Sequence, residues 1–224
     1  MREVCNGRVA HDLMDAQIYL IRHGETKWSL SGQHTGRTDL PLTEHGVLQA
    51  QHIGKLLSGT TFSQVLVSPL QRARRTCELA GLGAAARVQE NLSEWNYGDY
   101  EGRTPADIRV RRPSWDIYRD GAPGGESADQ VSARADAVIV ELRAMVGRIA
   151  IFSHGQFLRA LAVRWIDLPI QQGGHFDLDT GSISILGYEH NNLRAPTIFL
   201  WNAVSNDVFD LVPRQHSDEA LLGG

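Results

Sequence analysis

The chain has 224 residues, of which 42% are hydrophobic and 21% are charged, and its formal net charge is −4. These values are typical of one compact globular domain with a substantial core, and they exclude wholesale disorder. Nucleic-acid-binding proteins usually present a strongly basic face, so the negative balance predicts no nucleic-acid partner.

The termini and the cysteines bound the cellular setting. The only cysteines, Cys5 and Cys77, are too few and too far apart for a disulfide scaffold or a zinc site, which favours a reducing cytoplasm. No stretch approaches the length of a transmembrane helix, so we expect no membrane partner. We interpret residues 1–16 as a flexible extension, 17–204 as the folded domain and 205–224 as a loosely ordered tail.

The first half of the domain alternates strand and helix signals. Apolar, β-branched runs predict strands at 18–21 and 65–67, with a weaker signal at 87–89. A polar, glycine-containing loop is expected between residues 27 and 42. Thr43 is then a good N-cap for one helix, and Ser68 followed by Pro69 predicts the start of a second.

The second half opens with an irregular segment rich in aromatic residues, glycine and proline, and ends in regular elements. We interpret residues 92–126 as a partly helical lid over the carboxyl edge of the sheet. A 3.6-residue apolar period then predicts a helix at 127–145. The remaining expected elements are a strand at 149–152, a helix at 156–165 and strands at 182–186 and 197–201. This alternation favours an α/β fold: a three-layer α/β/α sandwich with a mainly parallel sheet.

Two strands end in a histidine followed by glycine, at His23-Gly24 and at His154-Gly155. A parallel sheet presents the carboxyl ends of its strands at one edge, and glycine lets the chain turn close to a ligand there. The pattern therefore predicts that the two imidazoles meet over one reacting atom.

The residues around these strand ends are those that phosphoryl transfer without a metal requires. Such a site needs a nucleophile, cations for the phosphoryl oxygens and an acid for the leaving oxygen. Arg22 and Arg72 supply cations whose planar forks match phosphate oxygens. Glu94, among apolar and aromatic neighbours, is the best candidate for the acid.

Five segments, taken in order, resemble the histidine phosphatase superfamily, and more narrowly its phosphoglycerate mutase-like branch. They are Arg22-His23-Gly24-Glu25-Thr26, Thr35-Gly36 with the following Asp39-Leu40-Pro41-Leu42-Thr43, Ser68-Pro69-Leu70-Gln71-Arg72, Glu94 with Tyr97-Gly98, and Ser153-His154-Gly155. The resemblance extends from about residue 18 to 201.

The resemblance implies a phosphoglycerate mutase-like fold and a role for each matched residue. His23 would be the phospho-acceptor and Glu94 the proton donor, while Arg22, Arg72 and His154 would hold the phosphoryl group. Ser29 stands where mutases usually carry an asparagine that touches phosphate. Thr35 and Gly36 match a substrate-contacting pair, and Tyr97 and Gly155 are expected to line the same pocket.

Three longer stretches, at 28–36, 94–102 and 115–127, are similar to fungal sedoheptulose-1,7-bisphosphatases. Arg119 lies in the third stretch and is a candidate substrate contact. His34 lies in the first, where both a substrate contact and a surface position remain open. The chain is shorter than those enzymes between Glu94 and His154, which is the region that would contact a sugar.

The predicted function is therefore hydrolysis of a small phosphorylated metabolite, a sugar phosphate or bisphosphate, through a phosphohistidine. Two alternatives remain: a cofactor-dependent phosphoglycerate mutase, and a catalytically silent phosphate-binding module.

No cofactor is expected, because the chain has neither a Walker A lysine motif nor a dinucleotide fingerprint. No metal is expected either, since His175, Asp177 and Asp179 lie in a glycine-rich loop without evident ligand geometry. The sequence leaves the oligomeric state open, with a homodimer the commonest assembly.

Overall fold

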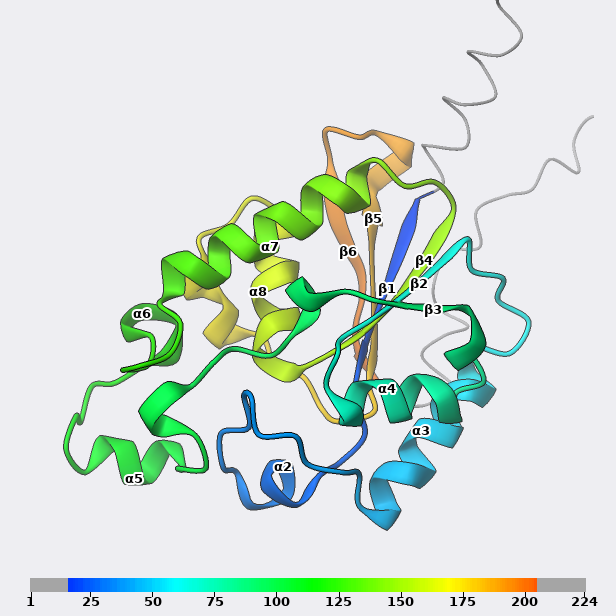
Figure 1. Cartoon of the computed structure of the whole chain (residues 1–224). Helices are drawn as coiled ribbons and strands as arrows, with labels where there is room; N and C mark the ends of the chain where they lie inside the picture. The colour runs from blue at the N-terminus through cyan, green and yellow to red at the C-terminus, as the bar shows by residue number, and fades with distance from the viewer. Residues whose placement is uncertain (1–15, 205–224) are drawn as a thin grey trace, which may run out of the picture.

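The computed structural model describes residues 16–204, which form one α/β unit (Figure 1). The expected tail at 205–224 and all of the expected extension except Ala16 lie outside these residues.

A six-stranded sheet occupies the centre of the molecule, in the order β3-β2-β4-β1-β5-β6. The first four strands in this order are mutually parallel, whereas β5 runs antiparallel to both of its neighbours, β1 and β6. The mainly parallel sheet is thus confirmed. The strands are β1 (Gln17–Arg22), β2 (Gln64–Val67), β3 (Ala86–Val88), β4 (Arg148–Ser153), β5 (Ile183–Tyr188) and β6 (Pro196–Ala203).

Helices cover both faces of the sheet, which confirms the three-layer architecture (Figure 1). Helices α3 (Glu44–Leu56) and α4 (Gln71–Leu79) pack on one face, and α7 (Ala128–Arg143) and α8 (Gly155–Trp165) pack on the other. Strand β1 shows why: Ile18 and Leu20 join the core under α7 and α8, whereas Ile21 joins the core under α3 and α4. Alternate side chains of a strand point to opposite faces, so both faces here are apolar.

The helix starts mostly follow their capping residues. The hydroxyls of Thr43 and Ser127 accept backbone N–H groups in the first turns of α3 and α7. The prediction for α4 was wrong by two residues, because the helix begins at Gln71 rather than at Pro69. The Gln71 N–H donates to the Asp39 carboxylate (2.8 Å), so a distant segment satisfies this helix end instead of Ser68.

The loop expected at 27–42 contains a short helix, α2 (Lys27–Ser31). Thr26 and Ser29 close a reciprocal capping box at its start, in which each side chain accepts the other's backbone N–H. Sequence reasoning did not find this helix, because it buries none of its residues and so has no apolar period.

Residues 92–126 form short turns around buried aromatic side chains. Trp95, Trp115 and Tyr118 are almost fully buried, and the short helix α6 (Ile117–Asp120) contacts α7. The short elements are η2 (Glu90–Leu92), η3 (Gly98–Tyr100), α5 (Pro105–Arg109) and α6 (Ile117–Asp120); elsewhere lie η1 (Gly83–Ala85), η4 (Ile170–His175) and η5 (Glu189–Asn191).

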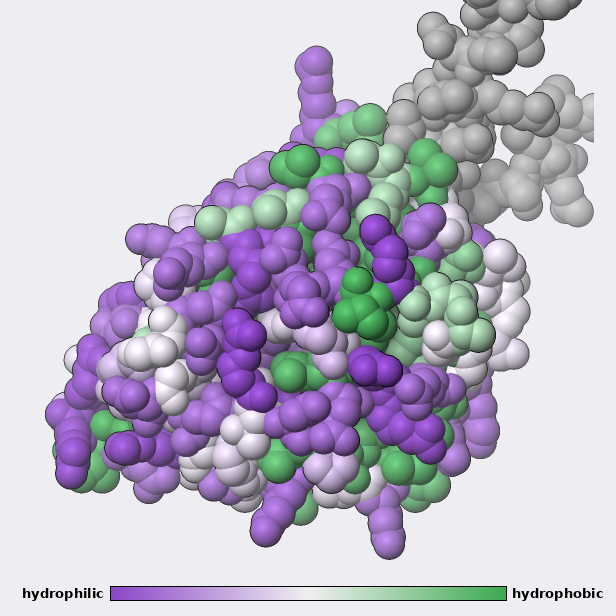
Figure 2. Space-filling model, viewed as in Figure 1, coloured by the Kyte–Doolittle hydropathy of each residue, from purple (hydrophilic) through white to green (hydrophobic). Residues whose placement is uncertain are grey.

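The surface seen in Figure 2 is mainly hydrophilic, with apolar side chains in small separate groups. This is the ordinary surface of a globular domain. Within residues 16–204, no helix combines the length and the apolar character needed to cross a bilayer.

Candidate active site

Strand register brings the two histidines together. Arg22, the last residue of β1, pairs with Ser153, the last residue of β4. His23 and His154 therefore follow directly after the ends of two adjacent parallel strands. Their imidazole rings lie 5.1 Å apart between centroids and are tilted by 58°. The two imidazoles are therefore adjacent, but only His23 lines the neighbouring cavity, so a shared contact of both rings with one reacting atom stays a prediction.

One hydrogen bond decides which nitrogen of His23 is available for chemistry. Nδ1 lies 2.7 Å from the carbonyl oxygen of Gly24, which can only accept, so Nδ1 carries the proton. This leaves Nε2 with a free lone pair. Gly24 permits the geometry, since a Cβ at that position would lie 2.3 Å from the carbonyl oxygen of Gly46.

His154 is in the other tautomer, with its proton on Nε2. The Nε of Arg72 donates to Nδ1 of His154 (3.1 Å), so the ring proton is on Nε2 and is donated to the Ser68 hydroxyl (2.7 Å). Arg72 and His154 are completely buried and lie behind the cavity wall. The other guanidinium nitrogens of Arg72 donate to the carbonyls of Thr35, Gly36 and Thr38.

Both histidines are held neutral. Burial lowers the pKa of His23 well below 6.5, and the charges of Arg72 and Arg22 lower it further. Burial, Arg72 and the neighbouring His23 lower the pKa of His154 in the same way. A buried imidazole with a free Nε2 and a low pKa is suited to act as a nucleophile.

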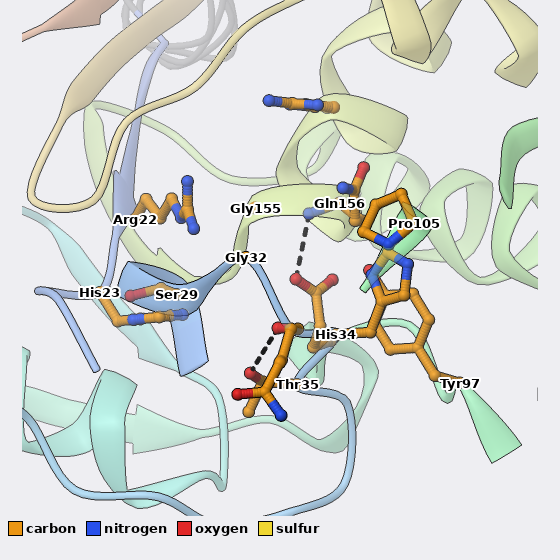
Figure 3. Close-up of a pocket in the computed structure, with 13 residues that line it drawn as sticks. Arg22, His23, Ser29, Gly32, His34, Thr35, Tyr97, Pro105, Gly155 and Gln156 are labelled. Atoms are coloured by element: carbon orange, nitrogen blue, oxygen red, sulfur yellow. Dashed lines mark hydrogen bonds between the residues drawn. The ribbon is translucent and has the colours of Figure 1, made fainter. Parts of the chain in front are cut away.

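A cavity of about 230 Å³ opens beside His23 (Figure 3). In this view Arg22, His23 and Ser29 lie on one side, while His34 and Tyr97 lie on the other. The complete lining is Arg22, His23, Ser29, Gly32, Gln33, His34, Thr35, Glu94, Tyr97, Pro105, Gly155, Gln156 and Arg159.

Glu94 is buried at the N-terminus of α8. Its Oε1 accepts the backbone N–H groups of Trp95 (2.9 Å) and Phe157 (2.8 Å), and its Oε2 accepts that of Gln156 (3.0 Å). The side chain is thereby fixed in orientation at the cavity wall.

Two arginines lining the cavity have a buried Nε without a hydrogen-bond partner within residues 16–204. Arg22 donates from Nη1 to the carbonyl of Leu178, and Arg159 donates from Nη2 to the Asp177 carboxylate (2.8 Å). Gly155 lets Arg22 lie against the start of α8, since a Cβ there would be 3.2 Å from the guanidinium carbon. Unpaired cationic donors in a cavity favour an anionic ligand.

An aromatic wall faces these cations. His34 stacks on Tyr97, with ring centroids 4.3 Å apart, and meets the edge of Trp115 at 5.4 Å. Burial, assisted by Arg109, lowers the pKa of His34 to about 4. Burial and the nearby Glu94 raise the pKa of Tyr97 well above 10. Both rings are therefore uncharged at neutral pH.

The predicted substrate contacts divide into two groups. Ser29, Thr35, Tyr97 and Gly155 line the cavity, although the Ser29 hydroxyl already accepts the Thr26 N–H (2.8 Å). Gly36 is buried behind the wall, with its N–H donated to Glu101 (2.7 Å). Arg119 is exposed, pairs with Asp120 and donates to the Ser114 carbonyl, outside the residues that line the cavity.

Several lining residues carried no assignment at the level of sequence, namely Gly32, Gln33, Pro105, Gln156 and Arg159. Arg159 could have been found: it lies four residues after Gly155 on a predicted helix and so shares the face that begins at the site. Pro105 had no comparable signal, because its position depends on how the segment at 92–126 folds back.

Within residues 16–204, no three histidine, cysteine, aspartate or glutamate side chains gather closely enough to hold a metal ion. Of the loop residues considered from sequence, Asp177 pairs with Arg159 and Asp179 accepts from Asn202 (2.9 Å).

We compared the sequence with models of known protein families, and one model matches nearly the whole described domain. The model of the histidine phosphatase superfamily, branch 1, matches residues 18–202. The chain belongs to this superfamily. It is an enzyme of the phosphatase class.

Individual relatives agree with this assignment. An acid phosphatase of Mycobacterium tuberculosis is 44% identical over 178 residues, covering 78% of this chain and 87% of the relative. The sedoheptulose 1,7-bisphosphatase of Saccharomyces cerevisiae is 31% identical over 245 residues, covering 81% and 90%. The resemblance to the fungal enzyme is thus confirmed, although the mycobacterial phosphatase has the higher identity. A solved structure of a Mycobacterium tuberculosis open reading frame superposes with a TM-score of 0.79 at 38% identity, covering 85% of this chain and 98% of that one.

Proposed function

We propose that this protein is a metal-independent phosphatase that hydrolyses a small phosphorylated metabolite, a sugar phosphate or bisphosphate, through a phosphohistidine at His23. The observation that carries the proposal is the hydrogen bond from His23 Nδ1 to the Gly24 carbonyl. It leaves a neutral, unprotonated Nε2 beside a cavity lined by Arg22 and Arg159.

The proposed reaction has two steps. In the first, His23 Nε2 attacks phosphorus, the bond from phosphorus to the ester oxygen breaks, and protonated Glu94 gives its proton to the leaving alkoxide. In the second, Glu94 takes a proton from water, the water oxygen bonds to phosphorus, and the bond from phosphorus to His23 breaks. Phosphate is released and Glu94 is protonated again.

The cations are proposed to stabilise the negative charge on the phosphoryl oxygens. Arg22, which lines the cavity, is proposed to act directly through its guanidinium. His154 is neutral and already donates its Nε2 proton to Ser68, so it is proposed to contribute only as a dipole behind the cavity wall. Arg72 is proposed to act through its charge and by holding the His154 tautomer, because its donors already contact His154 and three carbonyls.

Size and chemistry of the cavity support a small substrate. A volume of about 230 Å³ lies below that of pockets for drug-sized ligands and is suited to a phosphate with a short carbon chain or ring. Gln33, Thr35 and Gln156 supply polar groups that could bind hydroxyls, and the uncharged rings of His34 and Tyr97 offer a flat wall. One relative is named for a sugar bisphosphate, which supports the same class.

Two measurements test the proposal. Phosphate release should be screened over sugar mono- and bisphosphates with a chelator present, and the phosphoenzyme should be trapped by acid quench. His23→Ala should lose both turnover and the trapped phosphoenzyme, and a variant that kept most of its rate would remove His23 as the nucleophile. Isomerisation of phosphoglycerate that requires added bisphosphoglycerate, without net phosphate release, would instead indicate a mutase. No activity on any phosphate ester would indicate a silent binding module.

A further inference from the structure

The backbone that carries Glu94 is held from beneath by one side chain of α7. Nη1 of Arg134 donates to the carbonyls of Asn91 (2.9 Å) and Ser93 (2.6 Å), and Nη2 reaches the carbonyl of Glu94 itself (3.4 Å). These contacts span forty or more residues of sequence. These hydrogen bonds therefore fix the position of the backbone at residues 91–94 relative to α7.

A carboxylate completes the arrangement. Glu126 accepts Nε of Arg134 (3.0 Å) and Nη2 (2.9 Å), so the N–H donors of the guanidinium point to five acceptors. The same Glu126 accepts the backbone N–H of Asn96 (2.8 Å), on the other side of Glu94. The two side chains are only 13% and 18% exposed, so this pair is largely shielded from solvent screening.

Arg134 also contacts the residue that binds the Glu94 carboxylate. Its guanidinium lies 4.4 Å from the ring centroid of Phe157, whose backbone N–H donates to Glu94 Oε1 (2.8 Å). The backbone of Glu94 and one of its carboxylate donors therefore rest on the same arginine.

We propose that Arg134, together with Glu126, is the positioning residue for Glu94, and that it sets the efficiency of proton transfer without touching substrate. The inference rests on the proposed function of Glu94 as acid and base. Proton transfer requires the carboxyl group within hydrogen-bond reach of the leaving oxygen, so a small displacement lowers the rate of that step. Lysine can replace the guanidinium only in part, because it keeps the charge but has three donors and no planar fork.

Two substrates whose leaving groups differ in their need for a proton distinguish a positioning role of Arg134 from a merely structural one. When the phosphoryl group of p-nitrophenyl phosphate is transferred, the leaving group is a stable phenolate that needs no proton. When the substrate is glycerol phosphate, the leaving group is an alkoxide, which must be protonated as it departs. The measurement is the first-turnover rate of phosphoenzyme formation from each substrate by rapid quench. A variant that is partly unfolded loses amplitude with both substrates, but the ratio of the two rates stays unchanged.

The variants are Arg134→Gln, Arg134→Lys and Glu94→Gln, with the double variant of positions 94 and 134. Glu94→Gln should slow glycerol phosphate by about 100-fold or more and aryl phosphate little, as expected for loss of a general acid. Arg134→Gln should show the same selective loss, by about tenfold or more, and Arg134→Lys a smaller one. The double variant should match Glu94→Gln, because a residue that acts through Glu94 has no effect once Glu94 is gone.

The matched control is Arg164→Gln. Arg164 forms a similar two-pronged pair with Asp136 of α7 (2.8 and 3.2 Å), but its remaining hydrogen bond goes to the Leu168 carbonyl and not to the segment at 91–96. It should leave the ratio of rates unchanged. If Glu94→Gln shows no selectivity, the assignment of the acid fails. If Glu94→Gln is selective while Arg134→Gln and Arg134→Lys keep the ratio of the wild-type enzyme, the positioning role is overturned.

Discussion

Acidification from pH 7.5 to 5.5 should destabilise this protein through three buried histidines. His23 and His154 have pKa values well below 6.5 in the folded state, and that of His34 is about 4. In the unfolded chain the same side chains return to about 6.5. Below that pH the unfolded state binds more protons than the folded state, so stability is present at higher pH and is lost as the pH falls.

The magnitude follows from the linkage relation. A histidine that stays neutral in the folded protein and has an unfolded pKa of about 6.5 loses roughly 1.4 kcal/mol of stability between pH 7.5 and 5.5. Three such groups give about 4 kcal/mol, which is a large part of the 5–15 kcal/mol that typically stabilises a domain.

Urea unfolding at a series of pH values measures this loss directly. The variant His23→Gln removes one of the three groups, so its pH-dependent loss should fall to about two thirds of the wild-type value, whatever its stability at pH 7.5. His45→Asn, exposed on α3, is the matched control. A wild-type loss below about 1 kcal/mol, or an unchanged pH dependence in His23→Gln, would refute the reasoning.

Three further predictions concern the site and its support. Arg72→Gln removes a charge that lowers the pKa of His23, so the acid limb of kcat/KM should move to higher pH; an unmoved limb would mean that the charge of Arg72 does not contribute to that pKa. Gly98→Ala places a Cβ 2.2 Å from the Pro123 carbonyl at a φ of +48°, and should cost more than about 2 kcal/mol in urea unfolding. Gly59→Ala, with φ +83° and open space around it, should cost only about 1 kcal/mol, and equal losses would contradict the clash. Arg159→Ala should lower kcat/KM by about tenfold or more, as expected when a hydrogen bond to a charged group is lost. Arg119→Ala should change kcat/KM by less than about twofold. A larger effect of Arg119→Ala than of Arg159→Ala would mean that the substrate contacts the segment at 92–126 and not the cavity wall at Arg159.

The local signals of the sequence predicted the elements and the reactive groups well. Apolar runs located the strands that end just before His23 and His154, Thr43 marked one helix start, and the apolar period located the helix that follows Ser127. These features depend on neighbours within a few residues, so periodicity and capping chemistry are enough to find them. The apolar and aromatic neighbours of Glu94 already make it the candidate acid, and the family motifs imply the same role.

What the tertiary structure decided are the contacts between distant segments. Only the strand order β2-β4-β1 places Ser68 and His154 within hydrogen-bond distance, and only the folded loop at 35–38 turns its carbonyls toward Arg72. Neither Arg159 in the cavity wall nor Arg134 beneath Glu94 carries a local signal as strong as a motif. A buried guanidinium must find acceptors wherever the chain brings them, and those acceptors are backbone carbonyls that any residue can supply. The sequence therefore names the reactive groups, while the packing of remote segments determines their protonation and orientation.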